Sequence, residues 1–434
     1  MRILTTELFS KQIFFSDSAS SALYVVTSSL AGLFLASISI NYLGPELYGV
    51  WVILLSAMVL GNLGEQGIGL PIVRLVSKSS NAINDDLLIA SILPIAIFSV
   101  LIILILSLIS GSVVDFYFDV IGGQSNVELI LPTLGFIIFC FLLSTVYTSF
   151  LIGFGSLIKV NYIKSVARMV QFIGAYIFFS NGFGLWAAIG SLGLYHIIVV
   201  VLSAVFLSRN MYVVPKQLQC SEPLVFSNVW SVGGRLIVAR IAGIGIDPFF
   251  RFSLGAFIGL QYVAFFDLGF KVASLVVQIP RVALIGQVVK FREFHNTQSQ
   301  SKEKIHAKYR SLDLILASYF LACSLCLVVG VNWFLQLWLS SQFDIRITHT
   351  IWAILAFLLI SVFAYARELF IISIGNANVT IVAYLVNSVS LIIFVLLFKD
   401  IVSPNKYYFF ISLYGLTNLF GSLVYFSYFR KIIK

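Results

Sequence analysis

The sequence has few charged residues and few cysteines, and each shortage excludes a class of protein. Asp, Glu, Lys and Arg make up 10% of the chain, against about 25% in soluble domains. Hydrophobic residues make up 60%, and the mean hydropathy is +1.02, which excludes a soluble domain with a large core. A disulfide framework is excluded too, because Cys140, Cys323 and Cys326 lie in apolar stretches and Cys220 lies in a basic one. Cys323-x-x-Cys326 matches a redox motif by spacing only, and we interpret it as ordinary packing.

Motifs of catalysis and cofactor binding are also missing. The sequence has no P-loop, no His-Glu-x-x-His pattern and no nucleophile elbow, and its four histidines lie far apart. We therefore predict a protein that is not an enzyme and that has no catalytic site, metal or cofactor. The net charge of +9 does not indicate a nucleic-acid partner, because the excess Lys and Arg residues are placed as the positive-inside rule requires.

Long apolar stretches fill the chain instead. A membrane span needs about 20 apolar residues, and on this length the sequence predicts about twelve spans in an all-α polytopic membrane protein. The loop with Pro215 and Pro223 divides the chain near its middle, so we predict two six-helix bundles, 1–207 and 208–434. The predicted spans are 20–42, 48–70, 87–110, 127–150, 165–181, 185–207, 228–247, 260–286, 310–331, 347–373, 379–398 and 408–428.

The distribution of basic residues predicts the orientation. Most of the 27 Lys and Arg residues lie in segments on one side of the predicted spans, and only a few, such as Arg251 and Arg346, lie on the other. This bias predicts both termini in the cytoplasm. The loops on the opposite side are short, the longest running from Gly111 to Asn126, so no extracellular domain is expected.

Ionisable residues inside the predicted spans are candidate functional residues. Each costs about 2.5–3.5 kcal/mol to insert, so such groups usually face a protein interior or a water-filled cavity. Arg240 and Asp247 lie two helical turns apart and share a face. Asp267 and Lys271 are four residues apart with the acid first, so the lysine either neutralises the aspartate or faces a cavity. Arg240 and Lys271 lie nearest the midplane, whereas Arg235 is close enough to the cytoplasmic end to reach lipid headgroups.

Other polar residues inside the predicted spans have either a functional or a structural role. Arg367 and Glu368 are sequence neighbours that point about 100° apart on a helix, so each needs its own partner. His196 lies near the middle of its span and is either a proton carrier or a packing residue. Asn387 and Asn418 are expected to hydrogen-bond between helices. The acidic candidates for coupling to a proton or cation are Glu65, Asp247, Asp267 and Glu368.

Several short motifs, in their order along the chain, resemble those of a known family. The stretch Asn41–Trp51 resembles its first outer loop, and Glu65–Gly69 followed by Arg74 resembles its Asp-x-Gly-Leu turn, with Glu in place of Asp. Ile246–Pro248 resembles the stretch after span seven, and Gly375–Asn378 resembles the short loop between spans ten and eleven. The family is the Wzx-type polysaccharide-repeat flippases of the multidrug/oligosaccharidyl-lipid/polysaccharide (MOP) exporter superfamily, which also contains MATE transporters.

This resemblance implies two bundles around a central cavity with alternating access, in a bacterial inner membrane. The implied cargo is an undecaprenyl-pyrophosphate-linked oligosaccharide, moved from the inner to the outer leaflet for O-antigen, capsule or exopolysaccharide assembly. The implied partners are the lipid bilayer, a polysaccharide polymerase, a chain-length regulator and a coupling proton or sodium ion. Because Arg and Lys suit phosphate groups, the candidate cargo-binding residues are Arg240, Lys271, Arg235 and Arg367.

Two other functional classes are alternatives to a flippase. A membrane polysaccharide polymerase or ligase resembles this chain in hydropathy and Phe content, but such enzymes usually carry a long outer loop with functional Arg or His residues. A drug or cation antiporter from the related branch of the superfamily would need an excess of buried carboxylates, whereas the charge inside these spans is mostly positive.

Overall fold

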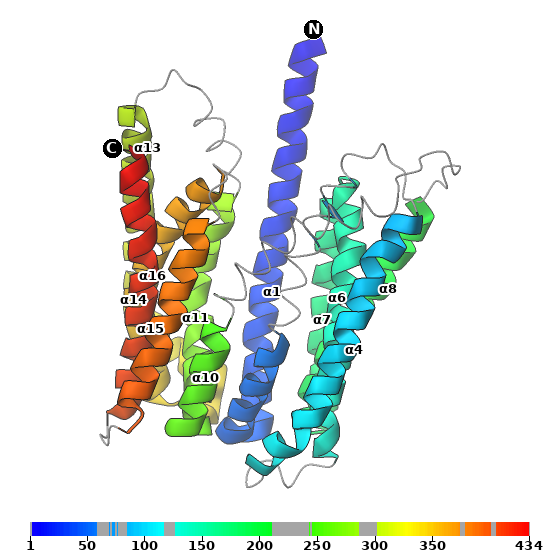
Figure 1. Cartoon of the computed structure of the whole chain (residues 1–434), viewed down its shortest axis with the longest axis vertical. Coiled ribbons are helices and arrows are strands. Elements are labelled where there is room, and N and C mark those ends of the chain that lie inside the picture. Colours follow the sequence, from blue (N-terminus) through cyan, green and yellow to red (C-terminus); the bar gives the residue numbers. More distant parts are fainter. Residues whose placement is uncertain are drawn as a thin grey trace. The chain divides into compact units, whose positions relative to one another are not determined.

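The computed structural model describes residues 2–58, 69, 72–73, 76, 85–116, 126–210, 243, 245–285, 302–373, 378–400 and 405–433. Every long element in these ranges is an α-helix (Figure 1). Nine of the described helices are long and apolar enough to cross a membrane. Outward-facing apolar side chains such as Leu108 and Val329 are 83% and 88% exposed, which suits lipid rather than water. The predicted all-α, multi-pass membrane fold is confirmed.

Three predicted spans are not separate members of these nine. The span predicted at 48–70 begins in the last part of the first helix and continues into residues outside the described ranges, and the span at 228–247 lies almost entirely outside them. The third, predicted at 165–181, is the helix α7 (Leu157–Ser180). Its first half carries Lys159, Lys164 and Arg168, which makes it too polar to count as a span by composition.

The first helix, α1 (Arg2–Leu55), contains a kink at Gly44, whose φ is 74° and ψ is 169°. Glycine adopts positive φ without a steric penalty, and Pro45 is well suited to the first position of the helical segment that follows. The outer loop expected between the first two spans is therefore a break at a single residue within one long helix.

The chain forms two compact units. One comprises Met1–Leu43 and Leu54–Ile237, and the other comprises Gly44–Ile53 and Val238–Lys434. The kink at Gly44 thus marks the point at which α1 passes from the first unit to the second. The predicted bundle boundary at 207/208 stays a prediction, because residues 211–242 lie outside the described ranges.

In the first unit, four helices pack side by side (Figure 1). Helices α6 and α7 both pack on α8, and α4 packs on α6. A short 3-10 turn, η1 (Ser56–Met58), follows α1, and another, η3 (Val127–Leu129), precedes α6. The bounds of the other helices are α4 (Asp85–Phe116), α6 (Ile130–Gly153) and α8 (Leu185–Asn210).

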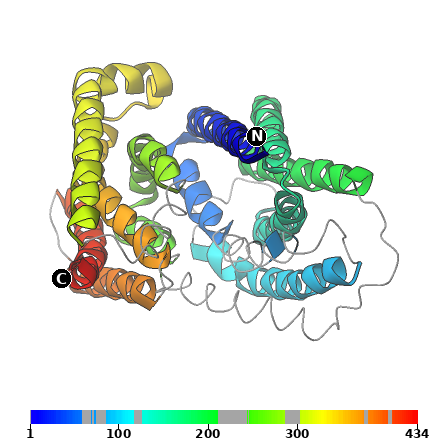
Figure 2. The same ribbon diagram turned by 90° about the horizontal axis from the view of Figure 1, so that it is seen from above.

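In the second unit, α11 and α16 pack on α14, and Figure 2 shows α15 (orange) beside α16 (red). The segment 44–53 of α1, which belongs to this unit, packs closely against α11, because a Cβ atom on Gly49 would lie 2.1 Å from the carbonyl oxygen of Leu260. The elements are α10 (Ile246–Phe257), α11 (Leu260–Ile285), α13 (Lys302–Leu339), η4 (Ser340–Gln342), α14 (Ile345–Ser373), α15 (Asn378–Phe398) and α16 (Lys406–Ile433).

Candidate functional site

A buried charge cluster, formed by Tyr48, Arg251, Asp267 and Lys271, lies in the second unit. Asp267 is only 3% exposed. Its carboxylate accepts hydrogen bonds from the Tyr48 hydroxyl at 2.8 Å, from Nη2 of Arg251 at 3.3 Å and from the Lys271 ammonium. Lys271 also donates to the Tyr48 hydroxyl at 3.0 Å. One carboxylate therefore serves two cations, and the cluster keeps a net positive charge.

Three segments build this cluster, and only part of it follows from the sequence. Asp267 and Lys271 lie one turn apart on α11 and form an ion pair, and whether Lys271 also serves the cargo stays a prediction. Tyr48 comes from α1, 219 positions away from Asp267, and no local pattern links the two. The distribution of basic residues places Arg251 in a segment outside the predicted spans, whereas in the structure it lies within α10 and reaches Asp267 from there.

The exposure of the cations determines what the cluster can bind. The side chains of Lys271 and Arg251 are 29% and 16% exposed, against 4% for Asp267. The two cations thus retain some access to their surroundings after pairing with Asp267. Arginine binds a phosphate through two parallel hydrogen bonds, and lysine binds it as a point charge. The cluster is therefore suited to holding an additional anionic group.

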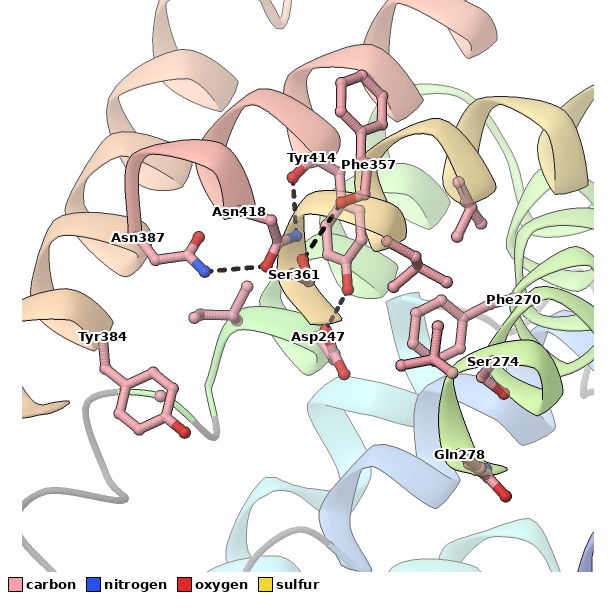
Figure 3. A pocket seen from close by; sticks show the side chains of 15 residues that line it. Asp247, Phe270, Ser274, Gln278, Phe357, Ser361, Tyr384, Asn387, Tyr414 and Asn418 are labelled. Carbon is pink, nitrogen blue, oxygen red and sulfur yellow. Dashed lines mark hydrogen bonds between the residues drawn. The ribbon is translucent and has the colours of Figure 1, made fainter. Parts of the chain in front are cut away.

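A cavity of about 370 Å³ lies within the second unit (Figure 3). Helices α10, α11, α14, α15 and α16 all contribute to its wall. Phe270, the residue before Lys271, is part of this wall, and its ring lies 6.0 Å from the Arg251 guanidinium. The polar side chains of the lining, apart from its tyrosines, are Asp247, Ser274, Gln278, Ser361, Asn387 and Asn418.

The cavity is rich in oxygen atoms, and none of the lining residues that the structure describes is Lys or Arg. The Tyr414 hydroxyl donates to Oδ1 of Asp247 at 2.6 Å, and Figure 3 shows the second carboxylate oxygen directed away from Tyr414. Nδ2 of Asn387 donates to Oδ1 of Asn418 at 3.0 Å, which confirms the predicted bond between helices. Oδ1 of Asn387 is buried and accepts no hydrogen bond from the described residues. Carboxylate, amide and hydroxyl oxygens are the ligands that hard cations prefer.

Arg367 and Glu368 have separate partners, as predicted. Arg367 forms a bidentate pair with Asp313 of α13, at 3.0 and 2.7 Å, and its guanidinium lies 4.5 Å from the centroid of the Phe426 ring. Glu368 accepts a hydrogen bond from the Tyr384 hydroxyl at 3.2 Å, and Tyr384 lines the cavity. Glu368 is thereby linked to the cavity wall, whereas Arg367 is bound to α13. Roles for either residue in cargo binding or coupling stay predictions.

His196 lies in the first unit and is 6% exposed. Its ring is packed against those of Phe141 and Tyr195, with centroids 4.9 Å apart in both pairs. Its Nδ1 atom has no hydrogen-bond partner among the described residues, and a role in proton transfer stays a prediction. Three further candidates, Glu65, Arg235 and Arg240, lie outside the described residues.

Solved structures similar to this chain cover almost all of it. A multidrug resistance MATE family transporter of the MOP superfamily, in an inward-facing conformation, matches with a TM-score of 0.72 and 17% identity over 94% of both chains. The lipid II flippase MurJ, in an inward closed conformation, matches with a TM-score of 0.69 and 14% identity over 94% of this chain and 86% of MurJ. A MOP superfamily transporter from Pyrococcus furiosus matches with a TM-score of 0.57 and 16% identity over 97% of this chain and 94% of that one.

These matches define the fold class. No protein-family model and no curated relative matches the sequence. The chain nevertheless has the fold of the MOP superfamily transporters, which have about 12 helices in two bundles. Two of these three similar proteins are named as transporters and one as a flippase.

Proposed function

We propose that this protein is a flippase of a bacterial inner membrane, with both termini in the cytoplasm. Its cargo is an undecaprenyl-pyrophosphate-linked oligosaccharide, which it moves from the cytoplasmic to the outer leaflet by alternating access. The observation that carries the proposal is the buried cluster in which Arg251 and Lys271 share the single carboxylate of Asp267. The fold similarity to the lipid II flippase MurJ and the motifs of the Wzx type support the same cargo class.

The chemistry of the cargo explains why buried cations are needed. A pyrophosphate and a sugar chain lose their hydration in hydrocarbon, and this loss is unfavourable unless other polar groups replace the water. Lys271 is the best-placed described candidate, because its ammonium belongs to a cluster with excess positive charge. Arg235 and Arg240 are candidates on the sequence alone. Arg367 is the weakest of the set, because Asp313 already occupies its guanidinium.

The direct test is a clean deletion in the source organism, with the gene restored from a plasmid as the control. We expect undecaprenyl-linked repeat units to accumulate on the cytoplasmic leaflet and surface polysaccharide to be lost. Mass spectrometry of extracted lipids identifies the glycan, and labelling by a membrane-impermeant reagent in inverted and right-side-out vesicles reports its leaflet. Loss of a polymerase would instead leave single repeat units on the outer leaflet, and normal surface polysaccharide in the deletion would refute the proposal.

The cavity around Asp247 supports a coupling site for sodium ion or proton, with Glu368 connected to it through Tyr384. We expect NaCl, compared with choline chloride, to raise the unfolding temperature of the purified protein if sodium is the coupling ion. If the proton is the ion, the response is to pH instead. Asp247→Asn removes the ionisable carboxylate and should abolish the response, whereas Glu128→Gln, an exposed acid before α6, should retain it. An unchanged response in Asp247→Asn would exclude this residue from coupling.

The same cavity is the one observation that favours a second candidate, a drug or cation antiporter, because the Asp247 carboxylate, with no Lys or Arg among the described lining residues, also suits a cationic drug. The two functions predict different phenotypes for the deletion strain. An antiporter deletion raises sensitivity to cationic drugs and leaves the lipid-linked glycans unchanged.

The flippase proposal also makes the polysaccharide polymerase and the chain-length regulator its expected partners.

A further inference from the structure

A second group of cations lies in the first unit, on α7. Lys164 and Arg168 are one turn apart on this helix. The ammonium of Lys164 lies 5.8 Å from the centroid of the Tyr24 ring of α1, and the guanidinium of Arg168 lies 3.9 Å from that of the Tyr195 ring of α8. Both cations therefore lie over aromatic rings of neighbouring helices, Lys164 over a ring of α1 and Arg168 over a ring of α8.

Arg168 is only partly satisfied in this position. Its Nη1 atom donates to Oε1 of Gln171 at 2.7 Å, but its Nε is buried and has no hydrogen-bond partner among the described residues. None of the described Asp and Glu residues forms an ion pair with it. A buried arginine N–H without an acceptor is unfavourable, so an acceptor at this point would be stabilising.

The surroundings of Arg168 add further polar atoms but no described carboxylate contact. Tyr24 shares hydrogen bonds with Tyr195 and Ser28 and lies in the electrostatic field of both Lys164 and Arg168. His196, next to Tyr195, is more than nine-tenths buried, and its Nδ1 is the second unpartnered nitrogen of the group. Like charges one turn apart on a helix repel each other, and Nε of Arg168 needs an acceptor that the described residues do not supply. The cluster is thus suited to an anion.

We propose that Tyr24, Lys164, Arg168, Tyr195 and His196 form a phosphate-binding site within the first unit. Phosphate fits better than carboxylate, because the guanidinium fork, the ammonium and the hydroxyls can serve three or more oxygens at once. The phosphate group can belong to a lipid headgroup or to a soluble ion, since both present the same oxygens. This site is separate from the Asp267 cluster, and the proposal does not depend on the identity of the cargo.

The test uses the purified full-length protein in dodecyl maltoside without phosphate in the buffer, and it measures the unfolding temperature. In one arm, inorganic phosphate and pyrophosphate are titrated, with acetate at equal ionic strength as the carboxylate control. In the other arm, phosphatidic acid is compared with diacylglycerol, which lacks only the phosphate. We expect saturable stabilisation by the phosphate compound in at least one arm, and the responding arm identifies the source of the group.

Variants then locate the site. Arg168→Gln should weaken the apparent affinity at least tenfold, Arg168→Lys should restore part of it, and Lys164→Gln should weaken it less. Lys159→Gln removes one positive charge from an exposed position of the same helix and should leave the affinity unchanged. The proposal is overturned if no phosphate compound stabilises the protein, if acetate matches phosphate, or if Arg168→Gln responds like the wild type.

Discussion

Replacing Asp267 with Asn is expected to lower the free energy of unfolding by about 3–5 kcal/mol, the typical effect of removing one partner of a buried ion pair. The amide has nearly the same shape, so packing is preserved while the charge is lost. Arg251 and Lys271 would then lie close together with no counter-charge in the cluster, and Tyr48 would lose its anionic acceptor. Thermal or denaturant unfolding in detergent micelles measures the effect. Restoration of surface polysaccharide in the deletion strain measures transport, which we expect to fail.

Lys271→Met distinguishes the two interpretations of Lys271. This variant keeps the Arg251–Asp267 pair and the Tyr48 hydrogen bond, so the loss of stability should be only about 1 kcal/mol. If Lys271 binds the cargo, polysaccharide export falls sharply in a protein that is still folded. If it only neutralises Asp267, export persists. The double variant Asp267→Asn with Lys271→Met should be more stable than Asp267→Asn alone, because one unpaired cation is gone. Wild-type stability in Asp267→Asn would refute the ion-pair argument.

The spans were predictable because length and apolar composition are local properties. Helices such as α15 and α16 consist mostly of apolar residues, and a bilayer imposes their length. The helix α7 was placed eight residues too late, at 165 instead of Leu157, because its first turns carry cations that an apolar criterion rejects. Those cations pack against aromatic rings of neighbouring helices, and tertiary contacts of this kind leave no periodic signal in a single sequence.

The candidate site was predictable from the sequence only in part. The Asp267–Lys271 pair follows from helical spacing, and the bond between Asn387 and Asn418 follows from the need of buried amides for partners. Tyr48 could not be placed, since its contact with Asp267 depends on how α1 crosses between units at Gly44. The cavity around Asp247 could not be placed either, because its wall combines residues from Gly243 to Asn418. Contacts over such sequence separations depend on the fold, and a single sequence does not specify them.

Gly49→Ala tests the contact between the segment 44–53 of α1 and α11 within the second unit. The added methyl group would lie 2.1 Å from the Leu260 carbonyl oxygen, and a backbone atom can move away only if the two helices separate. We expect a loss of about 1–3 kcal/mol in the free energy of unfolding, which is typical of overpacking. The shift would also draw Tyr48, the preceding residue, away from Asp267 and Lys271, so cargo transport should fall as well. Thermal or denaturant unfolding in detergent micelles measures the change in stability.

Gly32→Ala is the matched control on the same helix. No heavy atom lies within 4 Å of a Cβ atom placed there, and alanine favours a helix over glycine by about 0.8–1 kcal/mol. The control should therefore equal or exceed the wild type in stability, since it makes the same chemical change in open space. The difference between the two variants isolates the close approach at Leu260 from the general effect of glycine on a helix. If Gly49→Ala were as stable as Gly32→Ala, the segment 44–53 would not be held against α11, and Tyr48 would have no fixed place in the charge cluster.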